Sequence, residues 1–367
     1  MTTVLAIGTR KGLWLARRDD GPGSGDPARW TLSDRYLGMN AVYAVGIDTR
    51  RPVPRLLAGA DSEHWGPSVL TSDDLGETWQ EPDQGALRFP ERAGEALTRV
   101  WQLQPGPEGQ PDVVWAGTQP SALFRSEDGG KTYEFVDGLW DHPHRTEWAA
   151  GYGGQAVHTV VPHPDDPQRL LVAMSTGGVY RTTDGGTSWE PANRGISAYF
   201  MPDPEPEFGQ CVHKVAACPA RPDQLFAQNH GGVFRSDDWG TSWTSIGGGL
   251  PADFGFPVVA HPTRPGTAYV FPLAADADRR PATGRLEVYR TDDAGETWRS
   301  LHKGLPGEPH AGVVLRDAMC ADAGNPTGVY VGTRTGEVYA SADEGETWAL
   351  VADHLPDVLS VRAARVA

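Results

Sequence analysis

The stretch YRTTDGGTSW, residues 180–189, is the most informative part of this chain because close variants of it recur along the sequence. The shared core is Ser or Thr, any residue, Asp, any residue, Gly, any residue, Thr or Ser, and then Trp or Tyr. Successive central aspartates lie 54, 56, 54, 55 and 50 residues apart. A repeat of about 40–50 residues is typical of propellers and solenoids. The six copies are residues 70–79, 124–133, 180–189, 234–243, 289–298 and 339–348.

The residue types of this stretch predict a tight turn between two antiparallel strands. Asp and Ser or Thr side chains accept hydrogen bonds from nearby backbone N–H groups. Glycine takes a positive φ that other residues resist. The Trp that follows begins the next strand and offers a large apolar face to a neighbouring sheet. We therefore interpret the recurring aspartates as structural: Asp74, Asp128, Asp184, Asp238, Asp293 and Asp343.

The pattern resembles the Asp box of the BNR repeat family, which includes sialidases, xyloglucanases, sortilin-type receptors and a photosystem II assembly factor. The resemblance implies a β-propeller whose boxes lie on the face away from the ligand. It implies little about activity, because one fold carries many functions. Sialidases have an N-terminal arginine motif that residues 1–38 lack. Xyloglucanases work in a cleft between two propellers, and this chain offers one.

The two ends of the chain are incomplete in complementary ways. Residues 4–8, 13–17 and 30–32 match the second, third and fourth strands of a blade that lacks its inner strand. Residues 358–366 follow the last outer strand and match the missing inner strand. Pairing the two would remove sheet edges that invite aggregation. We therefore predict an all-β fold, a single seven-bladed β-propeller domain over residues 1–367, with the ring closed by the N-terminal and C-terminal strands.

Composition narrows the class of partner and the compartment. The net charge of −16, from 48 acidic and 32 basic residues, disfavours nucleic acid and anionic membranes as partners. Three widely spread cysteines give no disulfide framework and no zinc-binding pattern. The chain opens without the apolar segment of a signal peptide, and no apolar run approaches about 18 residues. We expect a cytoplasmic protein.

His158 and His213 are the most informative candidates for a site. Each lies six residues before the proline that closes its inner strand, so the two occupy equivalent positions in adjacent blades. Rotation about a propeller axis would bring such positions together at the mouth of the channel. Aromatic walls with a few polar groups are typical of a small-molecule site. The corresponding positions elsewhere are Tyr43, Trp101, Phe256 and Arg316 or Asp317.

Other candidate residues fall on connections that we expect at the same face. They are Arg10, Glu63, His64, Trp65, Glu147, Trp148, Asn229 and His230. Glycosidase chemistry needs two carboxylates, one as acid and one as base or nucleophile. Spacing does not fix such a pair among Asp61, Glu63, Glu147, Glu205, Glu207, Asp253 and Asp317.

We therefore predict a propeller that binds a small polar or aromatic molecule at the channel mouth. If the protein is an enzyme, we expect it to convert that molecule as well. If it is an enzyme, we expect glycosidase-like hydrolase or lyase chemistry with His158, His213, Arg316 and Asp317 as the catalytic set. We expect no cofactor; the alternative is a divalent metal shared by His158 and His213. The alternative function is a non-catalytic scaffold or assembly factor that holds a protein partner on the same face.

Overall fold

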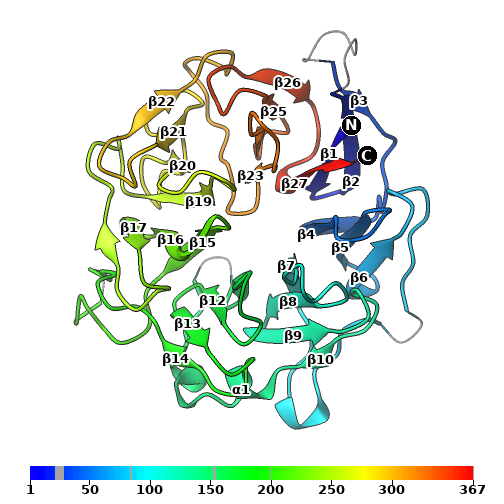
Figure 1. Cartoon of the computed structure of the whole chain (residues 1–367), viewed down its shortest axis with the longest axis vertical. Helices are drawn as coiled ribbons and strands as arrows, with labels where there is room; N and C mark the ends of the chain where they lie inside the picture. Colours follow the sequence, from blue (N-terminus) through cyan, green and yellow to red (C-terminus); the bar gives the residue numbers. More distant parts are fainter. Residues whose placement is uncertain (21–28, 83–84, 152–153, 200, 367) are drawn as a thin grey trace. The chain divides into compact units, whose positions relative to one another are not determined.

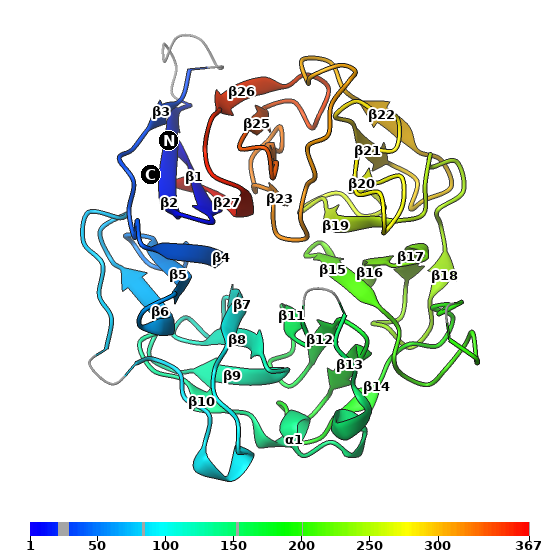
Figure 2. The ribbon, with the colours of Figure 1, turned by 180° about the vertical axis from the view of Figure 1, so that it is seen from behind.

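Seven β-sheets make up the computed structural model, which describes residues 1–20, 29–82, 85–151, 154–199 and 201–366 (Figures 1 and 2). Six of the described sheets have four strands and one has three. The α-helix α1 (Asp137–Trp140) and two short 3-10 helices, Glu91–Ala93 and Pro143–Glu147, accompany them. This confirms the predicted all-β fold, a seven-bladed β-propeller. Among the described residues, no helix has the length and apolar character needed to cross a membrane.

The first of two units comprises Met1–Gly38, Lys214–Trp239 and Trp243–Ala367. Its sheets have the strand orders β27-β1-β2-β3, β15-β16-β17-β18, β19-β20-β21-β22 and β23-β24-β25-β26. The strands are β1 (Thr2–Thr9), β2 (Gly12–Asp19), β3 (Thr31–Leu32), β15 (Val212–Cys218), β16 (Arg221–Asn229), β17 (Gly232–Ser236), β18 (Thr244–Ser245), β19 (Gly255–Ala260), β20 (Ala268–Pro272), β21 (Val288–Thr291), β22 (Arg299–Leu301), β23 (Met319–Ala321), β24 (Val329–Gly332), β25 (Val338–Ser341), β26 (Ala349–Ala352) and β27 (Val358–Val366).

The second unit comprises Met39–His213 and Gly240–Ser242. Its sheets have the orders β4-β5-β6, β10-β9-β8-β7 and β11-β12-β13-β14. The boundary at His213 falls inside β15, which we describe with the sheet to which it belongs. The strands are β4 (Asn40–Asp48), β5 (Arg55–Ser62), β6 (Gly66–Ser72), β7 (Arg99–Pro105), β8 (Val114–Gln119), β9 (Ala122–Ser126), β10 (Glu134–Phe135), β11 (Val157–Pro162), β12 (Leu170–Met174), β13 (Gly178–Thr182) and β14 (Glu190–Pro191).

The C-terminal strand completes the first blade, as predicted. β27 pairs antiparallel with β1 from Thr2↔Val366 to Thr9↔Val358, so the two ends of the chain lie side by side (Figure 1). Buried side chains from both strands, Ile7 and Val361 among them, enter one apolar cluster with those of β24. The N–H and C=O groups of β1 are therefore paired along both edges of the strand.

Each recurring stretch forms a turn, here called a box turn, that hydrogen bonds to its own aspartate. In residues 180–189, the Thr182 hydroxyl donates to Asp184 Oδ1 at 2.7 Å and the Ser188 N–H donates to the same oxygen at 2.9 Å. The Ser188 hydroxyl donates to Oδ2 at 2.5 Å. The Gly186 N–H in turn donates to the Thr182 hydroxyl at 3.0 Å. The carboxylate thus satisfies the turn that joins β13 to β14.

Two consecutive residues of each box turn take a positive φ, although the sequence pattern predicts only the second. The invariant glycine of the repeat has φ between 79° and 98° in all six turns. The residue before it is also left-handed, and it is not glycine in four of the turns, where Leu75, Trp239, Ala294 and Glu344 have φ of 55° to 61°. Such a residue is strained on the order of 1 kcal/mol. The surrounding hydrogen bonds hold it there.

The Asp184 carboxylate gives a first prediction, about stability and its dependence on pH. The Ser188 hydroxyl and N–H, with the Thr182 hydroxyl, lower the pKa of Asp184 to about 2. Replacing Asp184 with Ala should lower the melting temperature by a few degrees, because the turn loses its acceptor. Because the folded pKa is lowered, this stabilisation is complete above the ordinary carboxyl pKa and disappears as the pH falls toward about 2.

Thermal unfolding of both proteins between about pH 7 and pH 2 measures this effect. The gap between the two melting temperatures should stay constant down to about pH 5 and then narrow. Glu108→Ala removes an exposed carboxylate outside the box turns and is the matched control. A gap that is absent at neutral pH, or that widens in acid, would contradict the structural role of Asp184.

Candidate functional site

The strand ends opposite the box turns carry the candidate residues. In the second unit, Asn40 at the start of β4 pairs with Ser62 at the end of β5, and Arg99 at the start of β7 pairs with Gln119 at the end of β8. The box turn after Ser72 follows the other end of the same sheet, where Ser72 pairs with Leu56. One end of the blade therefore carries the box turn, and the opposite end carries the candidate residues.

At the inner-strand positions that are equivalent in the sequence, the strand pairing is irregular in four of the described blades. The pairing register shifts between Val42 and Ala44, between Val100 and Gln102, between Val157 and Thr159, and between Gly255 and Val258. β-Bulges of this kind occur beside functional sites and redirect a side chain. The residues within these shifts are Tyr43, Trp101, His158, and Phe256 with Pro257.

Tyr43 and Trp101 lie together, and the Arg99 guanidinium contacts both rings. Their rings are 5.4 Å apart, and Arg99 Cζ lies 4.1 Å from the Tyr43 centroid and 5.4 Å from the Trp101 centroid. Arg99 Nε is 3.3 Å from Asp61 Oδ2, and Trp101 Nε1 donates to Gln119 Oε1 at 3.1 Å. All five side chains are half-buried. We call this group the aromatic cluster: Tyr43, Asp61, Arg99, Trp101 and Gln119.

Sequence reasoning missed Arg99 as a member of this cluster. Arg99 precedes Trp101 by two residues in one strand, and alternate residues of a strand point to the same face. That spacing could have identified it. The cation over the Tyr43 ring is a cation–π contact, which stabilises both groups by about 0.5–1 kcal/mol at exposed sites.

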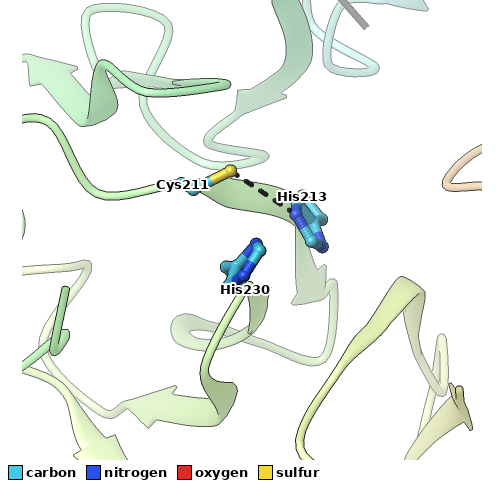
Figure 3. A group of neighbouring side chains, drawn as sticks. All are labelled: Cys211, His213 and His230. Atoms are coloured by element: carbon cyan, nitrogen blue, oxygen red, sulfur yellow. Dashed lines mark hydrogen bonds between the residues drawn. The ribbon is translucent and has the colours of Figure 1, made fainter. Parts of the chain in front are cut away.

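His213 lies in a second group, with Cys211 and His230 (Figure 3). The sulfur of Cys211 points toward His213, with 3.5 Å between Sγ and Nε2. The ligand atoms of the three side chains all lie within 4.8 Å of one another. Cys211 immediately precedes β15, His213 is in β15, and His230 is in the turn after β16, the neighbouring strand of the same sheet. We call this group the Cys–His cluster.

Aromatic and charged side chains surround His230. Its ring lies 5.2 Å from that of Phe254, which packs at 5.2 Å against Phe256. Arg279 Cζ lies 5.3 Å from the Phe256 centroid, and Asp276 Oδ2 is 3.7 Å from His230 Nε2. Burial lowers the pKa of His230, outweighing the nearby Asp276 carboxylate, so the neutral imidazole is favoured. Asn229, the residue before His230, is fully buried.

His158 is fully buried and is not one of the three grouped residues, although it contacts the backbone of Val212 between Cys211 and His213. Its Nε2 is 3.0 Å from the Val212 carbonyl oxygen and its Nδ1 is 3.1 Å from the Thr159 hydroxyl. A carbonyl only accepts, so Nε2 carries the proton and is not available to a metal. The structure therefore does not bring the two predicted histidines together as one pair of metal ligands. Their catalytic roles stay predictions.

Asp317 is the centre of a buried group of charges. Its Oδ1 accepts from Lys214 Nζ at 2.8 Å and from Arg362 Nη2 at 2.6 Å, and Asp317 is 3% exposed. Burial alone would raise the pKa of Asp317, but the two cations outweigh it and lower that pKa. Burial lowers the pKa of Lys214, with Arg362 and the half-buried Arg316 adding to the effect. Sequence reasoning missed both partners, which are 103 and 45 residues away from Asp317.

The other candidates divide into packed and exposed residues. Trp148 is buried and donates to the Tyr180 hydroxyl at 2.9 Å. Trp65 is 90% exposed in the turn between β5 and β6. A cavity of about 450 Å³ lies beside the box turn of residues 180–189 and is lined by none of the predicted residues. The remaining candidates are exposed: Arg10, Glu63, His64 and Glu147.

Similarity to curated proteins points to one class of enzyme. No protein-family model matches this chain. An oligoxyloglucan-reducing end-specific xyloglucanase from Emericella nidulans is 25% identical over 347 residues, which cover 82% of this chain and 40% of the relative. Xyloglucanase Xgh74A from Acetivibrio thermocellus is 24% identical over 265 residues, 62% of this chain and 30% of the relative. This chain therefore spans less than half the length of the curated relatives that it matches.

Solved structures support the same fold. The GH74 enzyme of Niastella koreensis aligns with a TM-score of 0.62 at 16% identity, covering 95% of this chain and 52% of that protein. An ancestral GH74 enzyme aligns with a TM-score of 0.58 at 17% identity, covering 85% and 38%. YCF48 from Cyanidioschyzon merolae aligns with a TM-score of 0.53 at 14% identity, covering 86% and 87%. At these identities, the likeness shows the fold alone. The curated relatives are xyloglucanases, and the chain is a β-propeller similar to them.

The charge group around Asp317 gives a second prediction. Asp317→Ala would leave the buried Lys214 and the half-buried Arg362 without their counter-charge, and should destabilise the fold by about 3–5 kcal/mol. Lys214→Met is the matched control, because Asp317 then keeps Arg362 and the loss should be much smaller. Urea unfolding of the three proteins gives the comparison. Equal, small losses for both variants would contradict a structural role for this carboxylate.

Proposed function

We propose that this chain binds a β-linked oligosaccharide of the xyloglucan type at the aromatic cluster. The half-exposed pair of Tyr43 and Trp101, with Arg99 and Asp61 at its edge, is the observation that carries the proposal. A pyranose ring has an apolar face of C–H groups and a rim of hydroxyls. Aromatic rings pack against the apolar face, and a carboxylate or a guanidinium forms hydrogen bonds with the hydroxyls.

The curated relatives support the choice of ligand. Proteins named as xyloglucanases match across most of this chain, the first of them over 82% of its length. The match reaches only part of each relative, so their activity does not transfer with the alignment. What the proposal takes from them is the ligand class. The exposed Trp65, in the turn that follows Asp61 at the end of β5, would extend the aromatic surface along a chain of sugars.

Binding is the activity that we propose, with hydrolysis as a separate measurement. Glycosidases place two carboxylates about 5–5.5 Å or about 6.5–9.5 Å apart across the scissile bond. The aromatic cluster as described holds one carboxylate, Asp61, and it is ion-paired with Arg99. This arrangement suits recognition of hydroxyl groups better than general acid catalysis.

Titration calorimetry with xyloglucan oligosaccharides tests the proposal. Trp101→Ala should weaken binding at least about tenfold, because loss of an aromatic anchor typically costs more than 1.4 kcal/mol. Asp61→Asn keeps the shape of the side chain and should weaken binding several-fold. Trp79→Ala is the matched control: it removes a half-buried tryptophan from a box turn of the same unit and should leave the affinity unchanged.

Reducing-end release, measured in the same samples, separates binding from conversion. Binding without release supports the proposal as stated. Release that persists in Trp101→Ala would show a hydrolytic site elsewhere on the chain and contradict the assignment to the aromatic cluster. Loss of affinity in Trp79→Ala but not in Trp101→Ala would place the ligand at the box turns, which would also overturn it.

A further inference from the structure

We infer that the Cys–His cluster, Cys211, His213 and His230, is a binding site for a borderline-soft divalent cation of the Zn²⁺ type. A thiolate with two imidazoles is a ligand set that favours Zn²⁺ over the oxygen-seeking Mg²⁺ and Ca²⁺. Three protein ligands leave a tetrahedral ion one further position, for water or a small ligand. The inference does not depend on sugar binding, which we assign to other residues.

The distances fit a tetrahedral ion. With Zn–S near 2.3 Å and Zn–N near 2.0 Å, tetrahedral geometry places a sulfur and a nitrogen ligand about 3.5 Å apart. Cys211 Sγ and His213 Nε2 are 3.5 Å apart. His230 completes a set in which all ligand atoms lie within 4.8 Å, so small side-chain rotations would bring it into range. Figure 3 shows the three side chains gathered around one point.

The backbone positions these ligands without a long loop. Cys211 and His213 are two residues apart at the start of β15, and alternate residues of an extended strand point to one face. His230 is in the tight turn that joins β16 to β17, next to β15 in the same sheet. A site built on paired strands is preorganised, because the ligands need little ordering when the ion arrives.

The surroundings supply what a metal site needs beyond its ligands. Asp276 Oδ2 is 3.7 Å from His230 Nε2, too far for a hydrogen bond, and a small rotation would let this carboxylate accept from the imidazole as carboxylates do in many metal sites. The Phe254 ring packs edge-on against the His230 ring and gives the group an apolar neighbour. His213 is only 4% exposed. An ion there would be partly desolvated and held by a fixed imidazole.

Metal binding by the full chain, stripped with a chelator and dialysed, tests the inference. Calorimetry with Zn²⁺ should show one site per chain. Co²⁺ should give the near-ultraviolet charge-transfer band of a cobalt thiolate. Cys211→Ser should abolish that band, and Cys211→Ser and His230→Gln should each weaken Zn²⁺ binding at least 100-fold. Cys218→Ser is the matched control, since Cys218 is a buried cysteine at the far end of β15 and outside the cluster.

Alkylation of Cys211 by iodoacetamide provides a readout that is independent of affinity. Bound Zn²⁺ should slow the alkylation of Cys211 in the native chain and leave the alkylation rate of His230→Gln unchanged. The inference is overturned if Zn²⁺ binding is equally tight in both cluster variants, or if it is lost only with Cys218→Ser. It is also overturned if the chain binds no Zn²⁺. Rapid alkylation of Cys211 below neutral pH would then indicate a thiolate activated by His213. Melting curves of each variant establish that the fold is intact.

Discussion

The hydrogen bonds that each box turn donates to its own aspartate are the interaction on which the described structure depends. In the turn of residues 180–189, Asp184 accepts from a hydroxyl two residues before it and from the N–H and hydroxyl four residues after it. Those bonds hold two successive residues in the left-handed region, which in four of the six turns includes a residue other than glycine. Arginines remote in sequence add to this support in three of the turns, where Arg55, Arg235 and Arg290 donate to the carbonyl oxygens of Gly129, Ala294 and Glu344.

Because a box turn stabilises one end of six of the seven blades, the opposite end is free to vary. There the structure places the aromatic cluster in one blade pair and the Cys–His cluster in another sheet. Both groups are built on strand starts and on the turns that face them, so rigid pairing supports variable side chains. Asp317 shows the limit of this freedom: its charge is matched by Lys214 and Arg362 and serves the packing of the first unit.

The fold could be predicted from sequence because its signals are local and repeated. Turn chemistry and a regular spacing indicate blades. The missing inner strand of the first blade and the extra C-terminal strand predict the pairing of β1 with β27. The site was only partly predictable. Tyr43 and Trp101 do meet, but His158, at an equivalent position, donates to the Val212 carbonyl instead. Equivalent positions share a bulge, and the direction in which a bulge turns its side chain depends on neighbours remote in sequence.

Hydrogen–deuterium exchange measures the central claim, that box turns hold the blades and ligands bind at the opposite strand ends. With a xyloglucan oligosaccharide, amides of residues 40–43, 61–66 and 99–101 should exchange more slowly, and with Zn²⁺ those of residues 211–213 and 229–232 should do so. Amides of the six box turns should exchange at unchanged rates with either ligand. Slowing confined to the box turns, with the strand ends unaffected, would contradict the account.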